Sequence, residues 1–153
     1  MAIDEDIRAF LEQAPATVVA SRDAEMRPAL ARAWGLDVQA DGSELTFCVG
    51  VPDGSPVQEN LEGNGAIAVT FSRPSTYRTV QIKGEVLALD EPTDEQLRAA
   101  DSHADAFSAE VLTLGLPADA GRRLRGEVRL ISVRMRVSEM FDQTPGPGAG
   151  SRL

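Results

Sequence analysis

The stretch from Ser55 to Gly84 constrains the fold of this chain most, because a short helix and two strands follow one another there with little between them. A strand of alternating bulky and small residues leads into it, and a turn rich in proline and glycine separates that strand from the helix. The expected order is a strand at 45–49, a helix ending at Asn64, and strands at 66–71 and 77–89. One short helix is thus inserted into a run of strands.

The start of this short helix is a candidate anion site. Ser55 is the expected N-cap and Pro56 the expected first helical residue, the positions where each residue type is best tolerated. The first N–H groups of a helix have no partner within it, and the helix dipole is positive at this end. The start of the helix is therefore a natural seat for a phosphate.

The rest of the sequence predicts further strands and three more helices. Thr93 and Gln96 form a capping box that starts a long helix ending before Gly115. Gly84 and Glu85 interrupt the alternation of the longest strand, which predicts a bulge or bend where a sheet closes into a barrel. The remaining expected elements are helices at 3–14 and 117–125 and strands at 16–21, 28–39 and 127–137.

Composition argues against several classes of partner and site. The net charge of −9 disfavours nucleic acid and anionic membranes. No leader with a basic and then an apolar segment is present, and no apolar run reaches membrane-spanning length, so a cytoplasmic protein is expected. The single cysteine, Cys48, and the single histidine, His103, predict neither a disulfide nor a metal site. Cys48 is expected to be buried, and His103 to lie at the surface or an interface.

The strand at 28–39 contains a charged residue in an unexpected place. Side chains alternate along a strand, so Arg32 shares a row with Leu30, Trp34 and other apolar residues. This pattern predicts a buried arginine, which needs an anion or several acceptors. Arg32 is therefore a candidate ligand-binding residue. The alternatives are an arginine that reaches solvent from the strand end and one that forms a salt bridge across a subunit interface.

The chain ends in a segment rich in glycine and proline. The expected organisation is one domain at 1–140 followed by a tail at 141–153. Alternate glycines in the tail resemble a phosphate-binding loop, but they lack the strand–turn–helix context of a dinucleotide site. An extended segment is expected, with closure of its N–H groups and Arg152 over a ligand, or packing against a partner subunit, as alternatives.

This order of elements predicts a mainly β (α+β) domain, a six-stranded antiparallel split barrel with flanking helices. It resembles the pyridoxamine 5'-phosphate oxidase-like, flavin-binding split-barrel family. The matching stretches together cover most of the chain from 16 to 89; they are 16–21, Met26–Leu30, 45–49, Ser55–Asn64 and Tyr77–Gly84.

The resemblance implies a homodimer that holds two molecules of flavin mononucleotide (FMN) in grooves between its subunits. The positions that the resemblance assigns to cofactor binding are Arg32, Trp34, Val49, Ser55, Gln58, Arg78 and Gln81. One departure is clear: Pro56, Val57 and Gln58 stand where the family has a basic cluster. Each missing cation removes a charge-assisted contact of about 1.5–3 kcal/mol, so weaker binding of FMN is expected.

Three functions are consistent with these features. The first is a flavin-dependent oxidoreductase with a small-molecule substrate, in which the cofactor carries the hydride chemistry and the protein supplies no nucleophile. The second is a non-enzymatic binder of flavin, haem or another planar cofactor, with His103 as a possible haem ligand. The third is a split-barrel dimer that has lost FMN binding. The sequence does not specify the substrate or the catalytic residues.

Overall fold

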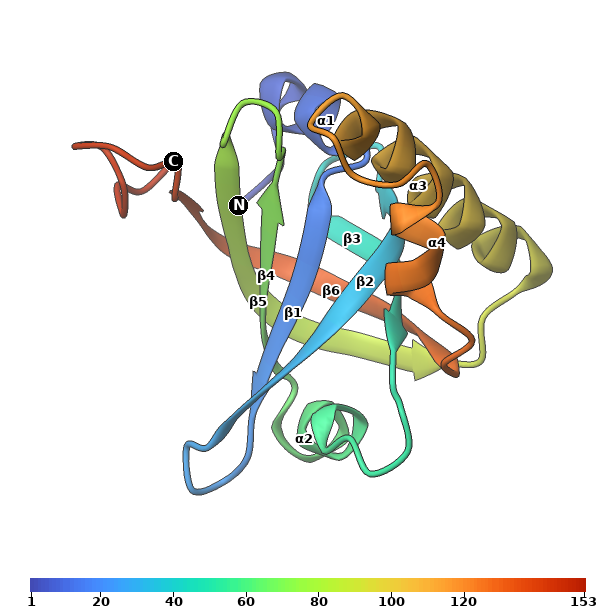
Figure 1. Cartoon of the computed structure of the whole chain (residues 1–153). Helices are drawn as coiled ribbons and strands as arrows, with labels where there is room; N and C mark the ends of the chain where they lie inside the picture. Colours follow the sequence, from blue (N-terminus) through green and yellow to red (C-terminus); the bar gives the residue numbers. More distant parts are fainter.

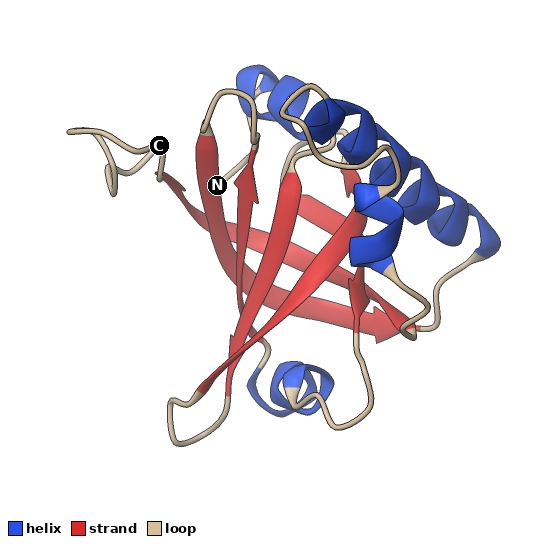
Figure 2. Ribbon diagram, viewed as in Figure 1, coloured by secondary structure: helices blue, strands red, loops and turns tan.

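The computed structural model describes all residues from Met1 to Leu153 and shows a closed six-stranded barrel with four helices around it (Figures 1 and 2). The strands are β1 (Ala16–Arg22), β2 (Pro28–Val38), β3 (Glu44–Gly50), β4 (Ala66–Ser72), β5 (Thr79–Asp90) and β6 (Leu130–Asp142). The helices are α1 (Glu5–Leu11), α2 (Val57–Asn64), α3 (Asp94–Leu112) and α4 (Ala120–Arg125). The predicted fold class is therefore confirmed.

All neighbouring strands are antiparallel, in the order β1-β2-β3-β6-β5-β4, with β4 returning to β1. Closure leaves no unpaired sheet edge. The register shifts between Lys83 and Gly84 where β5 pairs with β6, which confirms the predicted bulge. The register of the β2–β3 pair also shifts after Trp34, where Gly35 has a positive φ of 72°.

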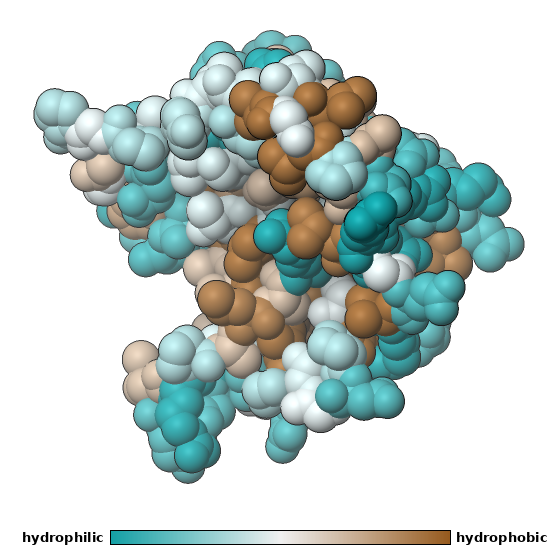
Figure 3. All heavy atoms as spheres, viewed as in Figure 1, coloured by the Kyte–Doolittle hydropathy of each residue, from teal (hydrophilic) through white to brown (hydrophobic).

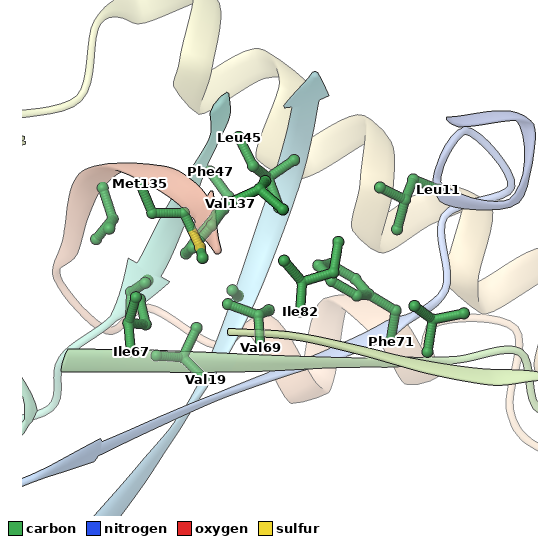
Figure 4. Packing of buried hydrophobic residues seen from close by; sticks show 14 of the residues in the cluster. Leu11, Val19, Leu45, Phe47, Ile67, Val69, Phe71, Ile82, Met135 and Val137 are labelled. Carbon is green, nitrogen blue, oxygen red and sulfur yellow. The ribbon is translucent and has the colours of Figure 1, made fainter. Parts of the chain in front are cut away.

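Large apolar side chains fill the barrel, and Figure 4 shows many of them pointing toward one another. Alternate residues of each strand supply this interior, as the period of a strand requires. Helices α1 and α2 lie at opposite ends of the barrel (Figure 1). Phe10 of α1 and Val57 of α2 are among the buried residues of this same core. The two short helices thus close the barrel at its ends.

Helix α3 covers the outside of the barrel beside β2 and β3 (Figure 2). Thr93 caps it through the predicted capping box, and the Gln96 Oε1 accepts in return from the Thr93 N–H. The Trp34 side chain points outward from β2 on this side and packs in a small cluster with Ala100 and Ala104 of the helix. None of the four helices combines the length and the hydrophobicity that crossing a bilayer requires.

Several boundaries differ from expectation by two or more residues, and two of the differences bear on the site or the sheet. Helix α2 has Pro56 rather than Ser55 as its N-cap, and no side chain caps it; the Ser55 hydroxyl accepts a bond of 3.4 Å from the Val57 N–H. Strand β6 extends to Asp142, beyond the expected end at 137, because it pairs with β3 only as far as Arg136 but with the long β5 as far as Asp142.

The end of the tail folds back against β6. Phe141 and Arg152 form an antiparallel bridge, and the Leu153 N–H donates to the Met140 carbonyl at 2.9 Å. Arg152 also forms an ion pair of 2.8 Å with Glu139. The tail therefore continues the sheet locally, while the glycine-rich loop between the paired segments is exposed.

Candidate functional site

The outer face of β2, β1, β4 and β5 is not covered by a helix, unlike the outer face beside Trp34 (Figures 1 and 2). We call it the cationic face and define it by the outward-facing residues Val18, Ala20, Arg22, Leu30, Arg32, Ala68, Thr70, Gln81 and Lys83. Its middle is apolar, and Figure 3 shows hydrophobic side chains gathered over β1 and β2. Leu30, on the β2 side of the face, is 67% exposed. An apolar surface of this kind on a barrel strand is typical of a binding or subunit interface.

Strand pairing arranges these side chains in rows across the sheet. One row runs from Arg32 through Val18 and Thr70 to Gln81. Its ends are three strand steps apart, which corresponds to about 14 Å at the usual spacing of a sheet. The neighbouring row runs from Leu30 to Lys83 across two alanines. The face thus has a floor of small and apolar groups with polar groups at its margins.

The positive charges of the cationic face have no acidic partner. Arg22, Arg32 and Lys83 form no ion pair, whereas every arginine elsewhere except Arg98 of α3 is paired with a carboxylate. Lys83 lies over the Phe141 ring at 4.9 Å from its centroid. In a chain of net charge −9, this concentration of unpaired cations on one surface favours an anionic ligand.

Two of the predicted cofactor-binding residues, Arg32 and Gln81, lie on this face. They are at the two ends of one row. The expected burial of Arg32 is wrong: its side chain is exposed. The inward row of β2 consists instead of Ala29, Ala31 and Ala33, because the interior is already filled by larger residues from the other strands and the helices. Arg32 therefore needs no buried acceptor and is free to contact a ligand from outside.

The other predicted residues lie elsewhere. Val49 is completely buried inside the barrel, and Trp34 is buried under α3, so neither side chain is accessible from the cationic face. Ser55 and Gln58 lie at the start of α2. Arg78 lies near the opposite end of the barrel, where it forms an ion pair with Asp6 of α1 and packs over the Phe10 ring.

The start of α2 lacks a free cation. Gln58 accepts a bond of 2.8 Å from Arg129, a residue distant in sequence, but Arg129 also forms an ion pair with Glu91. Glu59 adds negative charge to the first turn. The expected phosphate seat therefore has free N–H groups but an unfavourable charge environment.

His103 does not lie at the surface as expected but is buried between α3, β2 and the segment before β1. Its Nδ1 accepts a bond of 3.1 Å from the Gly35 N–H. The Pro15 carbonyl, 2.8 Å from Nε2, can only accept, so Nε2 carries the proton. Burial lowers the pKa of His103 below its usual 6.5, against an opposing effect of the Pro15 bond. Both nitrogens are occupied, so His103 is a neutral structural residue with no free position for a haem iron.

Cys48 is buried as predicted, with its outward side against α3. Burial raises the pKa of its thiol to about 11, against a small opposing effect of Arg125. The thiol is therefore protonated near neutral pH and inert as a nucleophile. Neither Cys48 nor His103 offers catalytic chemistry to the cationic face.

Sequence reasoning missed the contributions of Arg22 and Lys83. Lys83 is the only lysine of the chain and follows Gln81 on the same row of β5, but this pattern is also typical of a strand that faces water. Arg22 ends the outward row of β1 that contains Val18 and Ala20. The apolar residues of that row are the signal, because a solvent-facing row is normally polar.

Comparison with known proteins supports the fold. The structure matches HupZ of Group A Streptococcus with a TM-score of 0.57 and 16% identity, covering 97% of this chain and 99% of that one. It matches an F420 reductase with a TM-score of 0.54 and 17% identity, over 90% and 98% of the two chains. A pyridoxamine 5'-phosphate oxidase-related, FMN-binding protein from Nostoc punctiforme PCC 73102 matches with a TM-score of 0.51 and 13% identity, over 97% and 89%.

No protein-family model matches the sequence, and no curated protein matches it. The likeness is therefore one of structure at low identity. It confirms that the chain has the split-barrel fold of the pyridoxamine 5'-phosphate oxidase-related, FMN-binding proteins.

Proposed function

We propose that this split barrel is an FMN-binding oxidoreductase that holds the flavin on the cationic face, between two copies of the chain. The observation that carries the proposal is the coincidence of an apolar, uncovered surface with three unpaired cations, Arg22, Arg32 and Lys83. Structures with this fold include one protein described as FMN-binding and another described as an F420 reductase, which supports a flavin-type ligand.

The residues of the face fit such a ligand. A flavin combines a planar aromatic ring with an anionic phosphate, so it needs an apolar surface beside positive charge. Val18, Ala20 and Ala68 supply small apolar contacts for the ring. Arg32 and Gln81 lie at opposite margins of the same row and can bind polar edges of the ring.

The start of α2 fits the phosphate less well. Ser55 and the free N–H groups lie there, but the nearby Arg129 is already paired with Glu91. Positive charge for the phosphate comes in this proposal from the cationic face.

A second copy of the chain would complete the site. Leu30 projects from the β2 margin of the face and is largely exposed in the single chain. Pairing of two such faces would bury it and exclude water from the ligand, which strengthens electrostatic contacts. We therefore expect a homodimer with the cofactor at its interface.

A bound flavin would supply hydride transfer, chemistry that no side chain of the face can perform. Arg32 would bind negative charge at one margin of the ring. Gln81, whose Nε2 donates to the Thr70 hydroxyl at 3.2 Å, would be held in a fixed orientation by that bond. Hydride transfer by the flavin would require no acid or base from this face. The groove between the two copies would select the small-molecule substrate.

The visible spectrum of the purified full-length protein tests this function. The proposal predicts a yellow protein, or one whose melting temperature rises when FMN is added. Bleaching of the flavin by a reduced nicotinamide would establish the oxidoreductase. Retention of flavin without turnover would indicate a flavin carrier instead. A colourless protein that FMN does not stabilise would contradict flavin binding.

A further inference from the structure

A second feature of the cationic face is an open cavity of about 400 Å³ between β1, β4 and β5. Small residues form much of its wall, among them Ala20, Ala66 and Ala68. Arg22 and Lys83 also line it, from strands on either side of β4. The cavity therefore combines room for a small group with two cations in its lining, one on each side of β4.

The two cations of this cavity form no ion pair, although Glu85 of β5 lies opposite the cavity residue Ala66. Neither Arg22 nor Lys83 has a carboxylate within ion-pair distance; Arg22 donates only to the Asp23 carbonyl, at 3.3 Å. The register of β5 and β6 places Glu139 opposite Lys83, where it would be the natural partner. Glu139 instead forms an ion pair of 2.8 Å with Arg152. The carboxylate that lies opposite Lys83 is therefore occupied by Arg152 of the folded tail.

We propose that this cavity binds the carboxylate or phosphate group of a ligand through Arg22 and Lys83. The inference rests on the proposed function in one respect: the group belongs either to the flavin or to an anionic substrate bound beside it. A guanidinium and an ammonium can together satisfy several oxygens of one such group. The alanine wall leaves space for these oxygens, and the flexible Lys83 side chain reaches them by leaving the Phe141 ring of β6.

Inorganic phosphate is the probe that tests the cavity without assuming a flavin. We expect phosphate to shift the backbone amide NMR signals of Ala20 and Ala68 in a saturable manner. Lys83→Met and Arg22→Met should each weaken phosphate binding by about tenfold, the effect of losing one charge-assisted contact. Lys83→Arg should retain most of the affinity. Arg98→Met is the matched control, because Arg98 is exposed and unpaired but lies on α3.

Comparison of FMN with riboflavin distinguishes the two sources of the group. If the cavity holds the flavin phosphate, Lys83→Met will weaken FMN binding and leave riboflavin binding unchanged. If it holds a substrate group, neither flavin will be affected while phosphate binding is still lost. Phosphate affinities of Lys83→Met and Arg22→Met equal to that of Arg98→Met would overturn the proposal. Absence of flavin binding alone would not, because the phosphate titration stands by itself.

The tail provides an independent test of the same site. Arg152→Ala releases Glu139 to pair with Lys83, so phosphate binding should become several-fold weaker. Adding Glu139→Gln to that variant should restore it, since no carboxylate then remains to compete. Equal phosphate binding in the wild type and the Arg152→Ala variant would contradict the role assigned to the tail.

Discussion

His103 shows how a single residue can link three segments of a fold. Its neutral ring accepts from Gly35 and donates to Pro15, and it meets the Trp34 ring edge-on at 5.5 Å. Protonation would place a second N–H against the Gly35 N–H, which is a donor. The folded state therefore favours the neutral ring, consistent with a pKa of His103 lowered by burial.

This arrangement predicts that stability falls as the solution becomes mildly acidic. Below pH 6.5 the unfolded chain binds a proton on His103 that the folded protein resists, so the free energy of unfolding decreases as pH drops, by at most about 1.4 kcal/mol per pH unit. Carboxylates with a lowered pKa, such as Asp142, lose their contribution only near about pH 4 and below. Urea denaturation at pH 7.5 and pH 5.5 measures the effect.

The matched variant is His103→Gln, which should be less stable at pH 7.5 by about 1–3 kcal/mol but should lose this part of the pH dependence. The chain has one histidine, so its NMR titration is also unambiguous. A midpoint at or above 6.5, or equal pH slopes for the two proteins, would show that His103 is not held neutral by the fold.

Arg32 illustrates what alternation along a strand can and cannot predict. The pattern correctly places Leu30, Arg32 and Trp34 on one face of β2. It does not decide which face lies inside, because the inner row of alanines is less hydrophobic than the outer row. That choice depends on the volume left by distant residues, which the local sequence does not contain.

Between elements, the contact of α4 with α3 depends on the absence of a side chain. A Cβ at Gly121 would overlap the Ala104 carbonyl oxygen and approach Ser108 Oγ to 2.7 Å. The Gly121 N–H donates to that hydroxyl at 2.8 Å, so the helices are joined by a buried hydrogen bond as well as by packing.

We expect Gly121→Ala to destabilise the protein by about 1–3 kcal/mol, because the backbone of α3 must move to accept the methyl group. Thermal unfolding followed by circular dichroism measures this change. Gly63→Ala in α2 is the control, since a Cβ there meets nothing within 4 Å and alanine favours a helix. If both variants melted at the same temperature, the close packing of α3 and α4 would be contradicted.

Helix and strand positions follow from local signals more closely than their ends do. The Thr93 capping box and the glycine that ends α2 are local features, and both elements were predictable. The extension of β6 to Asp142 was not, because it depends on pairing with β5 far away in sequence. The return of the tail has the same cause: the partner of Arg152 is in β6, and nothing in the glycine-rich segment itself specifies it.

For the whole molecule, the uncovered cationic face predicts self-association. In a two-fold dimer formed by this face, Leu30→Glu would bury a carboxylate from each copy against the apolar surface of the other. We therefore expect this variant to be a monomer. Size-exclusion chromatography with light scattering measures the mass. Leu124→Glu on α4 is the control, because that side chain is 44% exposed but lies outside the face. Dimers of unchanged stability in Leu30→Glu would place the interface elsewhere.

The sequence predicts the split barrel because the strands, most turns and the Thr93 cap are signalled locally and their order matches a known arrangement. It does not predict the site to the same extent. Closure of the barrel brings Arg22, Arg32 and Lys83 onto one surface from three strands, and only long-range register determines that they share it. The same closure separates Ser55 from Arg78, which lie near opposite ends of the barrel.

Fluorescence titration of FMN tests flavin binding on the cationic face most directly. We expect saturable quenching with one flavin per chain, and an affinity about three- to tenfold weaker for Arg32→Ala, since Arg32 contributes one charge-assisted contact from an exposed position. Arg98→Ala should bind as the wild type does. The absence of saturable quenching, or equal affinities for the Arg32→Ala and Arg98→Ala variants, would contradict a flavin site on this face.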